Sequence, residues 1–132
     1  MTSGGPATIG IDVGGTKAAA LLVDPADGTI LDRERASSGG STADLVTTLV
    51  GLVDALRHRA SGHGRSVATV GLGIAGLVDR TGVVRWSPNL PAAVDHPVSD
   101  DLAATIDLPV ATANDATAAT VAEARMGAGR GC

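Results

Sequence analysis

The sequence lacks phenylalanine and tyrosine altogether, and Trp86 is its single tryptophan. A core must therefore be built from alanine, valine, leucine and isoleucine, in a chain of 132 residues of which 44% are hydrophobic. Proteins that bind single-stranded nucleic acid usually stack bases on aromatic side chains, and a formal net charge of −4 disfavours a polyanion. The composition therefore argues against a nucleic-acid partner.

Cysteine and long apolar runs are equally scarce. The one cysteine, Cys132, excludes a disulfide or a multi-cysteine metal site within this chain. No apolar run has the length of a membrane-spanning helix, and residues 1–7 lack the basic start and apolar stretch of a secretory signal. We therefore expect a cytoplasmic protein of one domain or one lobe, with no membrane partner.

Hydrophobic periodicity predicts three strands, a helix, and then alternating strands and helices, an order that indicates an α/β sheet with helices on its faces. The third strand has an alternation of charges that is typical of a solvent-facing strand, and Ser41 with Asp44 predicts a helix start. The expected strands are 9–13, 18–23, 29–36, 67–74, 83–86 and 110–113, and the expected helices run from 41 to the glycines at 62 and 64, from 97 to 108, and over 116–126.

A carboxylate, two glycines, a hydroxyl and a cation follow the first strand in Asp12–Lys17, DVGGTK. Glycine permits positive φ and close backbone approach, so successive N–H groups can converge on a phosphate oxygen. Asp12 could then support a hydrated Mg²⁺, which needs few protein ligands. A hairpin turn that needs glycine for its geometry is the alternative. The segment is not a P-loop, because it lacks the GxxxxGK[ST] pattern and a strand follows it.

Two further polar segments stand at boundaries between expected elements. Ser87–Pro91 is a loop constrained by two prolines, and such a loop can present the side chain of Asn89. Asn114 and Asp115 open the last expected helix, where helix N-capping accounts for both side chains without a catalytic role. From these residues alone, the functional and the structural interpretation both stay open.

Taken together, these segments resemble the sugar kinases of the ROK (repressor, open reading frame, kinase) family, within the actin and hexokinase superfamily. Ile9–Lys17 is similar to the family's first phosphate motif. Gly71–Asp79, Gly82–Val84 and Ser87–Pro91 are similar to its glycine turn, hairpin and Asn-bearing loop, with Ala75 where the family usually has proline.

The third segment, Asn114–Ala119, is similar to the family's NDANAA signature and has Thr117 in place of the commoner asparagine. Some actinobacterial-type glucokinases resemble this variant, which favours glucose as the sugar. The three motifs occur in the family's order, and the resemblance covers the chain from Ile9 to Gly131.

The resemblance implies a fold, a reaction and a set of residue roles. The fold is an α/β, actin/hexokinase-like (ribonuclease H-like) ATPase domain, of which residues 1–132 are the N-terminal lobe in the order βββαβ(β)αβα. The reaction is ATP-dependent phosphorylation of a hexose at its 6-hydroxyl, glucose above all, with ATP and Mg²⁺ as cofactors. The implied roles are Asp115 as catalytic base; Asn114, Asn89, Ala75 and Gly76 in sugar binding; and Asp12, Gly14, Gly15, Thr16 and Lys17 in phosphate binding, with Asp12 supporting Mg²⁺ through water.

Members of the family have a second lobe with the other phosphate loop, the adenosine pocket and often a structural zinc, and the full-length proteins are expected to be homo-oligomers. We expect these 132 residues alone to be a fragment without kinase activity. Three alternatives stay open. They are a sugar-responsive transcriptional regulator of the same family, a kinase for fructose, N-acetylmannosamine or N-acetylglucosamine or with polyphosphate as donor, and a nonfunctional remnant.

Overall fold

The computed structural model describes residues 5–38, 40–74, 77–81, 83–87 and 93–113. The predicted order of elements is confirmed over these ranges, and the helix expected over 116–126 lies outside them. Periodicity does not predict the short strand at 77–78, because two residues carry none, but this strand pairs with the strand at 84–86 as the hairpin that the resemblance implies in this segment. The elements are β1 (Ala7–Val13), β2 (Lys17–Val23), β3 (Ile30–Ser37), α1 (Thr42–Gly62), β4 (Val67–Ile74), β5 (Leu77–Val78), β6 (Val84–Trp86), α2 (Val98–Ile106) and β7 (Val110–Ala113).

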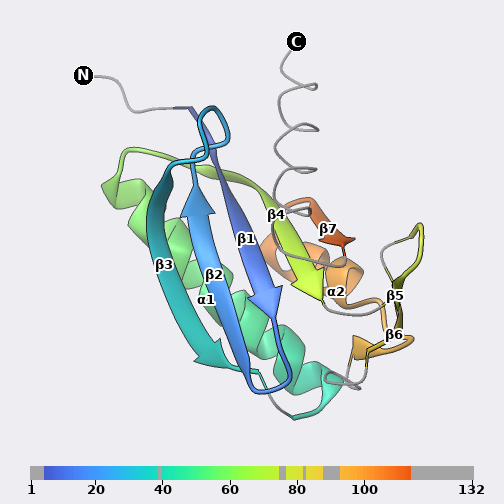
Figure 1. Cartoon of the computed structure of the whole chain (residues 1–132). Coiled ribbons are helices and arrows are strands. Elements are labelled where there is room, and N and C mark those ends of the chain that lie inside the picture. The colour runs from blue at the N-terminus through green and yellow to red at the C-terminus, as the bar shows by residue number, and fades with distance from the viewer. Residues whose placement is uncertain (1–4, 39, 75–76, 82, 88–92, 114–132) are drawn as a thin grey trace.

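Five strands form one mixed sheet in the order β3-β2-β1-β4-β7 (Figure 1). β2 runs antiparallel to both of its neighbours, whereas β1, β4 and β7 are parallel to one another. β5 and β6 form a separate antiparallel pair at one side of the sheet. Both α1 and α2 lie on one face of the large sheet, behind it in Figure 1, so the predicted α/β class is confirmed.

The core lies between this sheet face and the two helices. In the central strand β1, Ile9, Ile11 and Val13 are buried on the helical side, and the strand register places Val70, Leu72 and Ile74 of β4 beside them. α1 contributes leucines at helical spacing, as its sequence predicts. Burial of one such side chain is worth about 1.5–3 kcal/mol, and the aliphatic core needs no aromatic residue. The buried residues of α1 are Leu45, Leu49, Leu52, Val53, Leu56 and Ala60.

The start of α1 confirms the predicted cap. The Asp44 N–H donates to Ser41 Oγ at 3.2 Å, and the Ser41 N–H donates to Asp44 Oδ2 at 3.1 Å, which is a capping box. Gly40, just before the cap, has φ +108°, and a Cβ atom there would lie 2.6 Å from Asp44 Oδ2. At the other end, α1 stops at Gly62, and Gly64 has φ +70°, so the predicted glycine stop is confirmed too.

The prediction that β3 faces solvent is only half right. Arg59 of α1 binds two carboxylates on one face of β3, with Nη1 3.3 Å from Asp32 Oδ1 and Nη2 2.6 Å from Glu34 Oε2. Arg33 and Arg35, which alternate with these residues, are exposed. The alternation of charges therefore marks a strand with one side against α1 and one in water. Neither of the helices described is long and apolar enough to cross a membrane.

Candidate active site

The predicted motifs follow the carboxyl ends of neighbouring strands. β1 ends at Val13, β4 at Ile74 and β7 at Ala113, and because these strands are parallel, their ends lie at the same edge of the sheet (Figure 1). Ligands of open α/β sheets bind outside the carboxyl ends of the strands. Of the predicted site residues, Asp12 and 14–17 are described, whereas the other five lie outside the described residues: Ala75, Gly76, Asn89, Asn114 and Asp115.

The β1–β2 turn presents backbone donors at this edge. Gly14 N–H donates to the Lys17 carbonyl oxygen at 2.9 Å, which places Gly15 and Thr16 at the tip. Within the described ranges, neither the Gly15 N–H nor the Thr16 N–H donates a hydrogen bond. The side chains of Thr16 and Lys17 are exposed beside them. The two N–H groups without a hydrogen bond, the Thr16 hydroxyl and the Lys17 ammonium group are hydrogen-bond donors suited to phosphate oxygens.

The glycines of this turn serve close approach. The glycines with positive φ in the part of the chain that the structure describes are Gly28, Gly40 and Gly64, so of the two properties that glycine permits, Gly14 and Gly15 do not use positive φ. A Cβ atom on Gly14 would lie 3.1 Å from the carbonyl oxygen of Lys17, which is tighter than ordinary van der Waals contact. Glycine at position 14 therefore fits a turn at which the two strands come together closely, and a larger residue would need a small shift of the Lys17 carbonyl group.

Asp12 stands on the sheet face opposite the core. Its neighbours Ile11 and Val13 are buried toward α1, and its own side chain is exposed. The register places Ala19 of β2 on one side of Asp12 and Gly73 of β4 on the other. Residues directly opposite one another share a sheet face, so the neighbours of Asp12 on the two adjacent strands are both small. The exposed carboxylate of Asp12 therefore lies between two small residues of the sheet.

Gly73 is a neighbour of Asp12 that the sequence analysis did not single out. Gly71 and Gly73 alternate with Leu72 and Ile74 in β4, so the glycines lie on the face of Asp12 while the large side chains enter the core. Glycine inside a strand often marks a place where a ligand or another backbone comes close. That alternation is the sequence signal that could have identified this face.

The side chains that could bind a metal ion at this site suit magnesium better than zinc. No group of three or more His, Cys, Asp or Glu side chains that could hold a metal ion occurs among the residues that the structure describes. Mg²⁺ keeps several waters and is usually bound through one or two carboxylates together with substrate phosphates. A single exposed carboxylate, Asp12, beside a turn with free amides fits that requirement.

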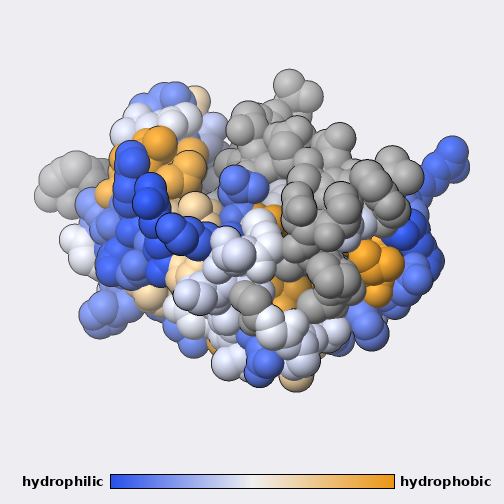
Figure 2. All heavy atoms as spheres, turned by 60° about the horizontal axis from the view of Figure 1, so that its bottom comes forward, coloured by the Kyte–Doolittle hydropathy of each residue, from blue (hydrophilic) through white to orange (hydrophobic). Residues whose placement is uncertain are grey.

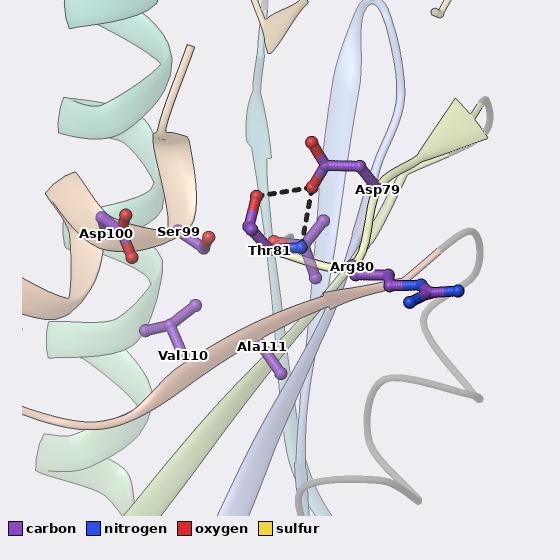
Figure 3. Close-up of a pocket in the computed structure, with 8 residues that line it drawn as sticks. Asp79, Arg80, Thr81, Ser99, Asp100, Val110 and Ala111 are labelled. Carbon is purple, nitrogen blue, oxygen red and sulfur yellow. Dashed lines mark hydrogen bonds between the residues drawn. The ribbon is translucent and has the colours of Figure 1, made fainter. Parts of the chain in front are cut away.

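A second hollow, of about 210 Å³, lies between the turn after β5, the start of α2 and β7 (Figure 3). Asp79, one of the two carboxylates that line it, forms hydrogen bonds within its own turn. Asp79 Oδ1 accepts from the Thr81 hydroxyl at 2.6 Å and from the N–H of Thr81 at 2.8 Å, and Oδ2 accepts from Arg85 at 2.9 Å. These bonds, that of the Thr81 hydroxyl first, hold the pKa of Asp79 far below its usual range. Asp79 therefore has a structural role, as its predicted place in a turn suggests.

Figure 2 brings the end of the molecule that carries the β1–β2 turn to the front. Outside the grey area, hydrophilic and near-neutral residues cover most of this end, and hydrophobic atoms appear only in smaller areas. The exposed residues of the turn and its strand, Asp12, Thr16 and Lys17, are polar. Polar ligands are therefore the kind that this edge of the sheet suits.

Comparison with known proteins assigns a class to this arrangement. The model of the ROK family matches residues 8–132, and the chain therefore belongs to the ROK family. It is 36% identical over 127 residues to the glucokinase of Streptomyces coelicolor and 38% identical over 131 residues to that of Thermotoga maritima. An N-acetylgalactosamine kinase of Shewanella is 31% identical over 123 residues. The matches cover 92–94% of this chain but only 37–38% of those proteins, so the chain spans little more than a third of their length.

Solved structures confirm the predicted fold. A ROK family glucokinase from Streptomyces griseus, in complex with glucose and AMPPNP, superimposes with a TM-score of 0.63 at 33% identity, over 82% of this chain and 33% of that one. A polyphosphate/ATP-glucomannokinase from Arthrobacter has a TM-score of 0.70 at 23% identity, over 83% and 44%. A ROK family transcriptional regulator has a TM-score of 0.66 at 15% identity, over 81% and 27%. The last two likenesses concern the fold alone.

Proposed function

We propose that residues 1–132 are the N-terminal lobe of a ROK sugar kinase that transfers a phosphoryl group from ATP to the 6-hydroxyl of a hexose, glucose above all. One observation carries the proposal. In a chain of the ROK family, the tip of the β1–β2 turn presents two unbonded amides beside the exposed Asp12, at the carboxyl edge of the parallel strands. The remaining contacts to ATP and sugar would come from a second lobe.

Phosphoryl transfer depends on positioning and on neutralisation of charge more than on covalent chemistry by the protein. In the proposed reaction the sugar oxygen attacks the γ-phosphorus, the bond from phosphorus to the bridging oxygen of ADP breaks, and Asp115 takes the hydroxyl proton. The amides at the turn, with Thr16 and Lys17, would hold phosphate oxygens. Asn114 and Asn89, with the backbone at 75–76, would orient the sugar.

Asp12 would hold Mg²⁺ through water, because its carboxylate is exposed, has the small neighbours Ala19 and Gly73, and lies at the strand end that leads into the turn. When bound, the ion would neutralise negative charge on the phosphates. A structural zinc, if the whole protein has one, is expected outside this chain.

Glucose is favoured by the relatives. The glucokinases of Streptomyces coelicolor and Thermotoga maritima are 36–38% identical to this chain, compared with 30–34% for kinases of N-acetylated hexosamines. Kinases for other sugars and a polyphosphate donor are the alternatives that an assay decides. A cytoplasmic location, homo-oligomeric assembly and the absence of nucleic-acid and membrane partners stay predictions.

The test is a coupled phosphorylation assay on the whole reading frame that encodes this chain, with glucose, fructose, mannose and N-acetylated hexosamines as acceptors. We expect turnover with glucose and a fall in kcat of about 10²–10⁴-fold in Asp115→Asn, the range for loss of a general base. The matched control is Asp107→Asn. Asp107 is exposed and ends α2 at φ 57°, a conformation that asparagine tolerates, so this variant should keep its activity. Failure to phosphorylate any sugar would overturn the proposal and favour the regulator or the remnant.

A further inference from the structure

Ser38 is a buried residue whose hydroxyl and N–H both donate hydrogen bonds to the β1–β2 turn. It follows β3 directly and is only 1% exposed. Its hydroxyl donates to the Gly14 carbonyl oxygen at 2.5 Å, across 24 residues of sequence, and its N–H donates to the Thr16 carbonyl oxygen at 3.0 Å. Ser38 therefore connects the end of β3 to the turn that carries Gly15.

These bonds determine which way the turn presents its donors. In a planar trans peptide, a carbonyl group and the following N–H point in opposite directions. The Gly14 carbonyl is held toward Ser38, so the Gly15 N–H, which belongs to the same peptide group, points away from Ser38. The Gly15 N–H forms no hydrogen bond to another described residue. One buried hydroxyl thus orients one amide donor at the tip of the turn.

Gly14 has no side chain to restrict this peptide group by itself. Without the Ser38 hydroxyl, the Gly14 carbonyl would lose a buried partner, and rotation of the peptide group would let it find water instead. The same rotation would turn the Gly15 N–H away from its present direction. Any ligand that needs this donor would bind with lower affinity, because the turn would have to be reordered on binding.

We propose that Ser38 is a positioning residue that orients the Gly15 N–H for a phosphate oxygen of the nucleotide. This inference rests on the proposed function, since it needs the turn to bind phosphate. It assigns no contact between Ser38 and the substrate. Its effect on affinity would pass through the peptide group between Gly14 and Gly15.

The test uses the protein of the whole reading frame that encodes this chain, labelled with ¹⁵N, first without ligand and then titrated with inorganic triphosphate or AMPPNP in the presence of Mg²⁺. In Ser38→Ala we expect lower order parameters for the Gly15 amide. We also expect affinity to fall about tenfold, which is close to the loss of one hydrogen bond to a charged group. The Gly15 amide should lose more of its ligand-induced shift than the Thr16 amide, which belongs to another peptide group. Ser38→Cys, which keeps the size and a weak donor, serves if the alanine variant does not fold.

The matched control removes another buried hydroxyl at the other end of β1. Thr8 is 1% exposed, and its hydroxyl donates to the Thr69 carbonyl oxygen at 3.1 Å. Thr8→Val should lower the melting temperature and leave triphosphate affinity unchanged. If Ser38→Ala behaves like Thr8→Val, with the order of Gly15 and the affinity unchanged, Ser38 is structural only and the inference is wrong. If the unaltered chain shows no shift at Gly15 or Thr16 with either probe, the phosphate site itself is wrong, and the inference fails with it.

Discussion

Gly40 offers a quantitative test of how the start of α1 is held. Its φ of +108° is a conformation that a residue with a Cβ atom rarely adopts, and an added Cβ would lie 2.6 Å from Asp44 Oδ2. Gly40→Ala should therefore introduce backbone strain of about 1–3 kcal/mol. It should also displace the Asp44 carboxylate, which accepts from the Ser41 N–H, and so remove part of a cap worth about 1 kcal/mol.

Asp44→Ala removes the same part of the cap without backbone strain, so by itself it should cost about 1 kcal/mol. The two changes share one interaction, and their free energies should not add. In the double variant Gly40→Ala/Asp44→Ala the clash with the carboxylate is absent and the cap is lost once, whereas the contact of 3.0 Å with the Cβ atom of residue 44 stays. The double variant should be more stable than the sum of the single losses predicts, by about 1 kcal/mol.

The assay is urea unfolding followed by far-UV circular dichroism on the four proteins of this cycle. Gly51→Ala is the matched control. Gly51 is an exposed glycine inside α1, and a Cβ there would meet nothing within 4 Å, so alanine should stabilise the chain by about 0.5–1 kcal/mol. If Gly40→Ala were as stable as the unaltered chain, or if the losses from Gly40 and Asp44 added fully, the reasoning on this cap would be refuted.

Two further predictions concern the core and the charges on β3. Leu72 is fully buried in β4, so Leu72→Ala should cost about 2–5 kcal/mol in urea unfolding, and a loss below about 1 kcal/mol would contradict its place in the core. The Arg33 N–H and, next, the Arg59 guanidinium lower the pKa of Asp32 below its ordinary value, so Asp32 stabilises the fold above the unfolded pKa of about 3.9. That contribution is lost as pH falls through the lower folded value. Asp32→Asn should therefore flatten the stability curve in acid, whereas Asp54→Asn, at an exposed position of α1, should leave its shape unchanged.

Local features of the chain could be predicted because the residues that form each of them are near one another in sequence. The capping box joins Ser41 to Asp44, three residues away, and the leucines of α1 recur with the period of a helix. The β1–β2 turn was expected at the right place for the same reason, since its closing hydrogen bond joins Gly14 to Lys17. The resemblance to ROK kinases, carried by short motifs at strand ends, was predicted as well, and the family match confirms it.

The features that sequence analysis missed depend on partners far along the chain. Arg59 meets Glu34 across 25 residues, and Ser38 meets Gly14 across 24 residues. Gly73 stands beside Asp12 only because β1 and β4 pair in one particular register. Hydrophobic periodicity does not identify such pairs, because a strand could pair in another register or orientation without any change in its own pattern.

The sequence by itself therefore determined the order of the elements, the caps of α1, the position of the turn and the family to which the chain belongs. These properties follow from local hydrogen bonding, hydrophobic periodicity and short motifs. Only the tertiary structure decided that one face of β3 packs against α1, that Gly73 stands beside Asp12, and that the Ser38 hydroxyl binds the Gly14 carbonyl oxygen. Those arrangements depend on strand register and on helix packing, which bring together residues that no local pattern connects.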